Sequence, residues 1–172
     1  MMRQRARARR GGVLLEYTLV GIPMMFALIS VFEMARGMWL YHTLAYTVKE
    51  ATRYASVHGA NCGVAPNSCS ITIGNIATVI QNQGTGLVPA NLTVTLTPAM
   101  GSATTDTLQN LLSNATQWPP ASPTGTNAVG QPITISAVYP FQSALAMFWP
   151  GSKPQSFGAV SLPASSTTRI LY

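Results

Sequence analysis

The stretch VLLEYTLVGIPMMFALISVF, residues Val13 to Phe32, decides how this chain is built. It contains twenty residues and a single charged side chain, that of Glu16. About twenty apolar residues in a helix span the roughly 30 Å hydrocarbon core of a bilayer. With Gly12 in front, the stretch predicts a transmembrane segment over residues 12–32. Pro23 is expected to bend this helix because it removes one backbone hydrogen bond.

The charges on either side of the span predict its orientation. Only Arg36 follows it closely, whereas five arginines precede it, namely Arg3, Arg5, Arg7, Arg9 and Arg10. By the positive-inside rule the N-terminus stays in the cytoplasm and the rest of the chain is exported, in a bacterium to the periplasm. A cleaved secretory signal peptide is the second interpretation. It is disfavoured because the apolar stretch is long, carries Glu16 near its start and ends in a poor small-residue cleavage site.

The helix is expected to continue past the membrane, as a periplasmic extension over residues 33–58. This segment contains no proline, its apolar residues recur at helical spacing, and Gly59 then offers a helix stop. Residues 13–58 would form one rod of about 70 Å. The residues expected to face inward in its second half are Met34, Met38, Tyr41, Ala45, Val48, Thr52 and Ala55.

The predicted helix carries few charged side chains. Glu33 and Arg36, and likewise Glu50 and Arg53, stand three positions apart and can form ion pairs worth a few tenths of a kcal/mol each. Glu16 lies inside the span, where a carboxylate costs a few kcal/mol, and this favours a functional role with a partner group. The alternative is that Glu16, close to the cytoplasmic interface, simply reaches water.

Composition argues against several classes of function. The chain has 172 residues, of which 47% are hydrophobic and 8% charged, whereas soluble domains average roughly 25% charged residues. The formal net charge of +6 belongs to the arginine tail, since from Gly12 onward five basic residues face four acidic ones. No basic patch with interleaved aromatic residues follows, so we expect no nucleic-acid partner. The sequence contains no phosphate-binding loop, His-Glu-x-x-His motif or plausible triad, so we expect neither an enzyme nor a cofactor.

The two cysteines, Cys62 and Cys69, are separated by six residues. No histidine or further cysteine stands at zinc-ligand spacing from them, so no metal site is expected. In an oxidising compartment a disulfide between them would close a short loop, and two free thiols are the alternative.

Residues 59–172 predict a small α+β domain. Alternating apolar and polar residues indicate antiparallel strands, helical spacing indicates two short helices, and residues 117–132, rich in Pro, Gly, Ser and Thr, indicate an irregular surface loop. The expected fold is α+β, with a long N-terminal helix, transmembrane and then amphipathic, packed on a small antiparallel sheet. The expected strands are Leu92–Thr97, Ile133–Tyr139 and Ala159–Tyr172, the last interrupted by Pro163, and the expected helices are Ile76–Gln83 and Asp106–Asn114.

The run RRGGVLLEY, residues 9–17, resembles the class III leader and processing site of type IV pilin-like proteins, in which a basic leader and a Gly precede an apolar helix with Glu at the fifth mature position. Cleavage after Gly11 makes Glu16 the fifth residue, and cleavage after Gly12, where Ala is commoner in the family, stays the alternative.

More specifically, the first 58 residues are similar to TadE-like pseudopilins (minor pilins) of the tight-adherence (Tad) pilus system. They share a Glu-x-x-Arg sequence where the span ends (Glu33, Arg36) and an Arg-Tyr-Ala sequence before the globular part (residues 53–55). Residues 133–141 and 161–172 also resemble the end of such proteins, whereas residues 60–132 carry no family motif.

The resemblance implies a pilin-like fold and a minor subunit for assembly of an adhesive pilus. A prepilin peptidase would remove the leader, residues 1–11, and the Glu16 carboxylate would meet the new α-amino group of a neighbouring subunit. The implied partners are the membrane, the peptidase, other pilin and pseudopilin subunits and the Tad inner-membrane assembly platform. The alternatives are an unprocessed single-span membrane protein with a periplasmic partner-binding domain and, less favoured, an arginine-tailed nucleic-acid binder.

Overall fold

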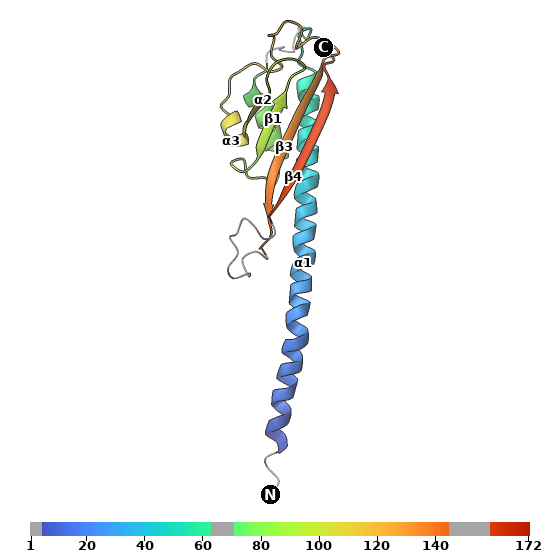
Figure 1. Ribbon diagram of the computed structural model, residues 1–172, viewed down its shortest axis with the longest axis vertical. Coiled ribbons are helices and arrows are strands. Elements are labelled where there is room, and N and C mark those ends of the chain that lie inside the picture. Colours follow the sequence, from blue (N-terminus) through green and yellow to red (C-terminus); the bar gives the residue numbers. More distant parts are fainter. Residues whose placement is uncertain (1–4, 63–70, 145–158) are drawn as a thin grey trace.

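The computed structural model of the protein describes residues 5–62, 71–144 and 159–172. Figure 1 shows one long N-terminal helix whose second half packs against a small domain. This arrangement confirms the predicted α+β class and the long helix on an antiparallel sheet. The elements are α1 (Arg5–Ser56), α2 (Ile73–Gln83), β1 (Thr93–Thr97), β2 (Thr104–Thr107), α3 (Leu108–Leu111), β3 (Pro132–Gln142) and β4 (Ala159–Arg169).

Helix α1 has 52 residues, which corresponds to about 78 Å at about 1.5 Å per residue. It begins at Arg5, inside the arginine tail, and ends at Ser56, two residues before the expected end. It runs through Pro23 as one helix, although the proline nitrogen has no hydrogen to donate to the carbonyl of Leu19.

The inward face of α1 differs from the predicted one. Val48, Thr52 and Ala55 are buried as expected, but Met34 and Met38 are 68% and 58% exposed and Tyr41 is also exposed. The stripe that the domain covers consists instead of Leu40, Leu44, Thr47, Val48, Ala51, Thr52 and Ala55. Helical periodicity fixes the spacing of such a stripe. It does not fix which of two adjacent apolar stripes the domain covers, and that explains the error.

The sheet has four antiparallel strands in the order β2-β1-β3-β4. Strands β1, β3 and β4 correspond to the three predicted strands. Pro163 does not interrupt β4, because β4 lies at the edge of the sheet, where a missing backbone donor is tolerated. Strand β2 escaped prediction because its sequence, TTDT, contains no apolar residue.

The helix expected over Asp106–Asn114 is shorter than predicted, since Asp106 and Thr107 belong to β2 and only Leu108–Leu111 is helical. The Asp106 Oδ1 atom accepts hydrogen bonds from Asn110 Nδ2 at 2.9 Å and from the backbone N of Thr107 at 2.7 Å. These two bonds hold the pKa of the Asp106 carboxyl below its usual range.

The hydrophobic core lies between the sheet on one side and α1 with α2 on the other. Helix α2 begins three residues earlier than predicted because Thr72 caps it, its hydroxyl accepting from the backbone N of Asn75 at 3.2 Å. The largest fully buried side chains come from all these elements and include Leu44, Ile73, Ile76, Ile80, Leu92, Leu96, Ile133, Ile135 and Ile170.

Residues 117–132 form no helix or long strand, as predicted, but they are not simply a surface loop. Trp118 is 3% exposed and its backbone N donates to the carbonyl of Ile71 at 2.9 Å. Thr126 is fully buried and its hydroxyl donates to the carbonyl of Pro123. The turn-forming composition of the segment gave no indication that these two side chains complete the core.

The end of the chain is joined to the end of α1. Leu171 N donates to the carbonyl of Ser56 at 2.8 Å, and the side chain of Ile170 is buried. Gly59 lies directly under this contact: a Cβ atom at this position would collide with Tyr172 O and with the Ile170 side chain, and would approach Asn127 O to 2.9 Å. Gly59 is therefore needed for the close approach of three backbone segments.

We predict that Gly59→Ala lowers the free energy of unfolding by about 2–4 kcal/mol, because backbone atoms must move to admit the methyl group. The measurement is chemical unfolding of the full chain in detergent micelles. Gly21→Ala is the matched control, since its methyl group would meet only a Tyr17 ring carbon at 3.9 Å. Equal stability of both variants would contradict the close approach at Gly59.

Candidate functional site

Residues 12–32 of α1, which we call the apolar half, pack against no other described element (Figure 1). The apolar half belongs to a helix long and apolar enough to cross a membrane, and none of its most apolar window is buried. Large apolar side chains point outward all around it; Leu19, for example, is 71% exposed and Phe32 is 74% exposed. A surface of this kind is consistent with anchoring in a membrane.

Glu16 is the only charged residue in this apolar half, and its side chain is exposed. The neighbouring hydroxyls are satisfied by their own helix, since Thr18 Oγ1 donates to Leu15 O at 3.0 Å and Ser30 Oγ to Phe26 O at 2.8 Å. No side chain that the structure describes pairs with the Glu16 carboxylate. The carboxylate is therefore a charged group inside the span that has no partner on its own helix.

Gly12 lies four residues before Glu16, so that the two share one face of α1. A Cβ atom at Gly12 would meet nothing within 4 Å, so the described part of the chain does not require glycine there for packing. The peptide bond between Gly11 and Gly12 lies inside α1.

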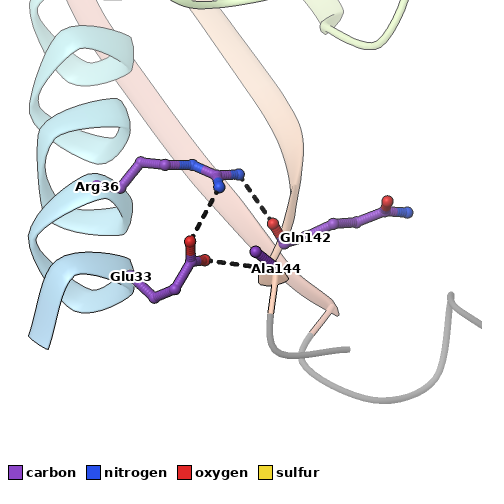
Figure 2. A network of polar contacts seen from close by, with 4 residues as sticks. All are labelled: Glu33, Arg36, Gln142 and Ala144. Atoms are coloured by element: carbon purple, nitrogen blue, oxygen red, sulfur yellow. Dashed lines mark hydrogen bonds and ion pairs between the residues drawn. The ribbon is translucent and has the colours of Figure 1, made fainter. Parts of the chain in front are cut away.

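A set of polar contacts, which we call the ribbon clamp, connects α1 to the end of β3 just beyond the apolar half (Figure 2). Arg36 Nη1 lies 3.2 Å from Glu33 Oε1, and Arg36 Nη2 donates to the carbonyl of Gln142 at 2.9 Å. The other carboxylate oxygen of Glu33 accepts from the backbone N of Ala144 at 3.1 Å. The clamp thus consists of the side chains of Glu33 and Arg36 and the backbone of Gln142 and Ala144.

Phe141 packs beneath the clamp. The guanidinium carbon of Arg36 lies 4.9 Å from the centre of the Phe141 ring, which is the geometry of a cation–π contact. The ring is 8% exposed and lies against the helix at Gly37, where a Cβ atom would come within 3.5 Å of it. A charged pair and an aromatic ring therefore fix the end of β3 to the same turn of α1.

The clamped end of β3 has little other support. β1 pairs with β3 only as far as Val138, so residues 139–142 pair with β4 alone and form a two-stranded ribbon. An isolated two-stranded ribbon is marginally stable in water. This end of the ribbon therefore depends on its contacts with α1.

The predicted site residues have different outcomes. The Glu33–Arg36 pair is present, and its two backbone partners were missed because a backbone group leaves no mark in the sequence. The expected Glu50–Arg53 pair is wrong for the described structure, in which Arg53 is exposed and no ion pair joins the two side chains, because long solvated side chains gain little by pairing. Cys62 is buried and disulfide-bonded, while Cys69 lies outside the described residues.

A half-open cavity of about 270 Å³ lies beside the clamp. Its lining is mostly apolar and comes from α1, from the turn after α2 and from β3, with Arg36, Trp39, Leu40, Thr85, Gly86 and Tyr139. Within the described ranges, no three His, Cys, Asp or Glu side chains gather where they could hold a metal ion.

Comparison of the chain with models of protein families, with curated proteins and with solved structures finds no match in any of the three. The function must therefore be argued from the geometry of this chain.

We predict that Arg36→Leu frees the end of the ribbon while changing global stability by only about 1 kcal/mol, because the Arg36 side chain is half exposed. The backbone N of Ala144 donates to the Glu33 carboxylate, which loses its orientation without Arg36. Hydrogen exchange at this N–H should therefore accelerate at least about tenfold. Glu50→Ala, on the same helix but in no ion pair, is the control and should leave that exchange rate unchanged. Unchanged protection of Ala144 in Arg36→Leu would show that the clamp does not hold the ribbon.

Proposed function

We propose that this chain is a TadE-like pseudopilin, a minor pilin-like subunit for assembly of a Tad-type adhesive pilus. In this proposal residues 12–32 cross the bacterial inner membrane once, with the N-terminus in the cytoplasm and the small domain in the periplasm. The observation that carries the proposal is an unpacked apolar helix with one unsatisfied carboxylate near its start, continuous with a helix that packs on a sheet.

The carboxylate supports assembly with like subunits for an energetic reason. A charge inside apolar packing is very costly when unpaired and tolerable when paired, so helices that bury Glu16 would adopt the register that supplies a cation. Cleavage after Gly11 creates such a cation, the α-ammonium group of Gly12, on every subunit. The pairing partner is then the ammonium group of a neighbouring subunit.

The N-terminal residues agree with processing. The described packing does not require glycine at position 12. The small size of Gly12 can therefore serve another purpose. A membrane-embedded prepilin peptidase would need a small residue at its cut and a charged leader beside the bilayer. Residues 1–11 supply that leader, with its five arginines.

The ribbon clamp supports the same arrangement. It lies within one turn of Phe32, the last residue of the expected span, so the end of the β3–β4 ribbon would lie at the outer surface of the membrane. A domain fixed at that height would enter a growing pilus in one orientation relative to its helix. The implied partners remain the peptidase, other pilin and pseudopilin subunits and the inner-membrane assembly platform.

We predict that the membrane-extracted protein lacks residues 1–11 and that Gly11→Leu retains them, because the bulky side chain would block the peptidase. Intact-mass measurement reports both. Gly21→Leu, a matched change inside the span, should be processed normally. An intact N-terminus in the natural chain would favour the unprocessed single-span membrane protein whose periplasmic domain binds a partner.

We predict that Glu16→Ala is inserted into the membrane normally but is incorporated into pili at least about 100-fold less, since one charge of a buried pair is left alone. Immunodetection in sheared pili and in the membrane fraction measures the two amounts. Thr18→Ala is the control, because the Thr18 hydroxyl bonds only to its own helix. Normal incorporation of Glu16→Ala would refute the proposed pairing.

A further inference from the structure

The face of the sheet directed away from α1 is covered by hydroxyl groups. Strand register brings these side chains into rows that run across the strands: Thr97 opposes Thr134 and Thr134 opposes Thr167 in one row. The next row contains Thr105, Thr95, Ser136 and Ser165, directly opposite one another across all four strands. A third row begins with Thr107 and Thr93. We call these nine residues the hydroxyl face.

The hydroxyl face is ordered before any ligand arrives. Thr95 Oγ1 lies 2.9 Å from Thr105 Oγ1, and Thr134 Oγ1 lies 2.8 Å from Thr167 Oγ1, so neighbouring strands are linked by hydroxyl pairs. Threonine is β-branched and has few rotamers to lose. Sheet geometry spaces the rows about 6.7 Å apart along the strands and neighbouring hydroxyls about 4.8 Å apart across them. A repetitive ligand would therefore meet a regular, preorganised surface.

The chemistry of the face excludes several classes of partner. The nine residues carry no charge. The charged side chains in the register are Asp106, which alternation places on the opposite face of β2, and Arg169 at one end of β4. A nucleic acid or an acidic polymer would find only one positive charge here, that of Arg169 at the edge of the face. The centre of a protein–protein interface is typically enriched in aromatic residues, Met and Arg, and these rows contain none.

An uncharged polymer rich in hydroxyl groups fits a face that is uncharged and can form hydrogen bonds. Each threonine or serine hydroxyl can both donate and accept, so it can match a sugar hydroxyl in either role. The third row ends in Val138 opposite Pro163, and Val138 is 41% exposed. This pair offers a small apolar surface to the carbon–hydrogen face of a sugar ring.

We propose that the hydroxyl face binds a neutral polysaccharide. This proposal names a ligand class for a subunit of an adhesive pilus and in that sense rests on the proposed function. The binding itself is a property of the sheet and can be measured on the isolated protein. Each contact is individually weak, so strong attachment requires several copies acting together on one polymer surface.

The test uses the full chain in proteoliposomes, which present many copies, and microcrystalline cellulose as the neutral probe. The proteoliposomes should sediment with cellulose at low salt and equally at about 1 M salt, since no ion pairs contribute. At about 1 M salt, where the charges of the arginine tail are screened, they should not bind alginate, which is anionic. Failure to bind cellulose and a second neutral polysaccharide, amylose, would overturn the proposal, whatever the result for incorporation into pili.

Replacing Thr95, Thr105, Thr134 and Thr167 together by Val removes both hydroxyl pairs and keeps side-chain shape and strand preference. Half-maximal binding should then need at least about tenfold more cellulose. Thr116→Val, an exposed threonine outside the sheet, is the matched control and should bind normally. Thr95→Lys, a single change that places a charge in the second row, should also weaken binding and serves if the fourfold variant does not fold.

Undiminished binding by Thr95→Lys and by the folded valine variant would show that the polysaccharide binds elsewhere. A second copy of this chain is the other partner that could cover the hydroxyl face. The oligomeric state of the detergent-solubilised protein tests for it. Dimers that dissociate in Thr95→Lys, with no cellulose binding by the natural protein, would assign the face to self-association and overturn the proposal.

Discussion

The apolar half of α1 must be removed from water, and no described part of its own domain removes it. A buried Leu, Ile, Met or Phe side chain contributes about 1.5–3 kcal/mol, and residues 12–32 display such side chains all around the helix. The second half of the same helix buries its inward stripe against β3, β4 and α2. One continuous helix therefore has two different surroundings, and the end of the β3–β4 ribbon meets the helix at the point where they change.

That point is the turn of α1 that carries Glu33 and Arg36. The clamp contributes little free energy, because Arg36 is half exposed and its pair is screened by water. Its importance is geometric, since it fixes the otherwise poorly supported end of the β3–β4 ribbon to one turn of the helix (Figure 2). Phe141 beneath Arg36 excludes water from one side of the contact and so strengthens it. The position of the ribbon end along α1 is set there.

Sequence patterns predicted what periodicity controls and missed what depends on distant partners. The long helix and strands β1, β3 and β4 were predicted because their apolar residues repeat at helical or strand spacing. Strand β2 and the burial of Trp118 were missed, since each depends on a partner that local composition does not reveal. Met34 and Met38 were assigned to the wrong face because two apolar stripes lie side by side on α1. Of the clamp, the side-chain pair was predictable and the backbone acceptors and donors were not.

The scarcity of charge, 8% of residues, has two physical origins in this chain. One is the apolar half of α1, where Glu16 stands alone. The other is the sheet, in which the two-residue period of each strand places Val94, Leu96, Ile133 and Ile135 against the helices and threonine or serine on the opposite face. In soluble domains a solvent-exposed face of this kind usually carries Lys and Glu. Here uncharged threonine and serine side chains stand in the place of Lys and Glu. The face therefore lacks the charge repulsion that discourages association. A surface so poor in charge is suited to contact with a partner that is itself neutral and polar.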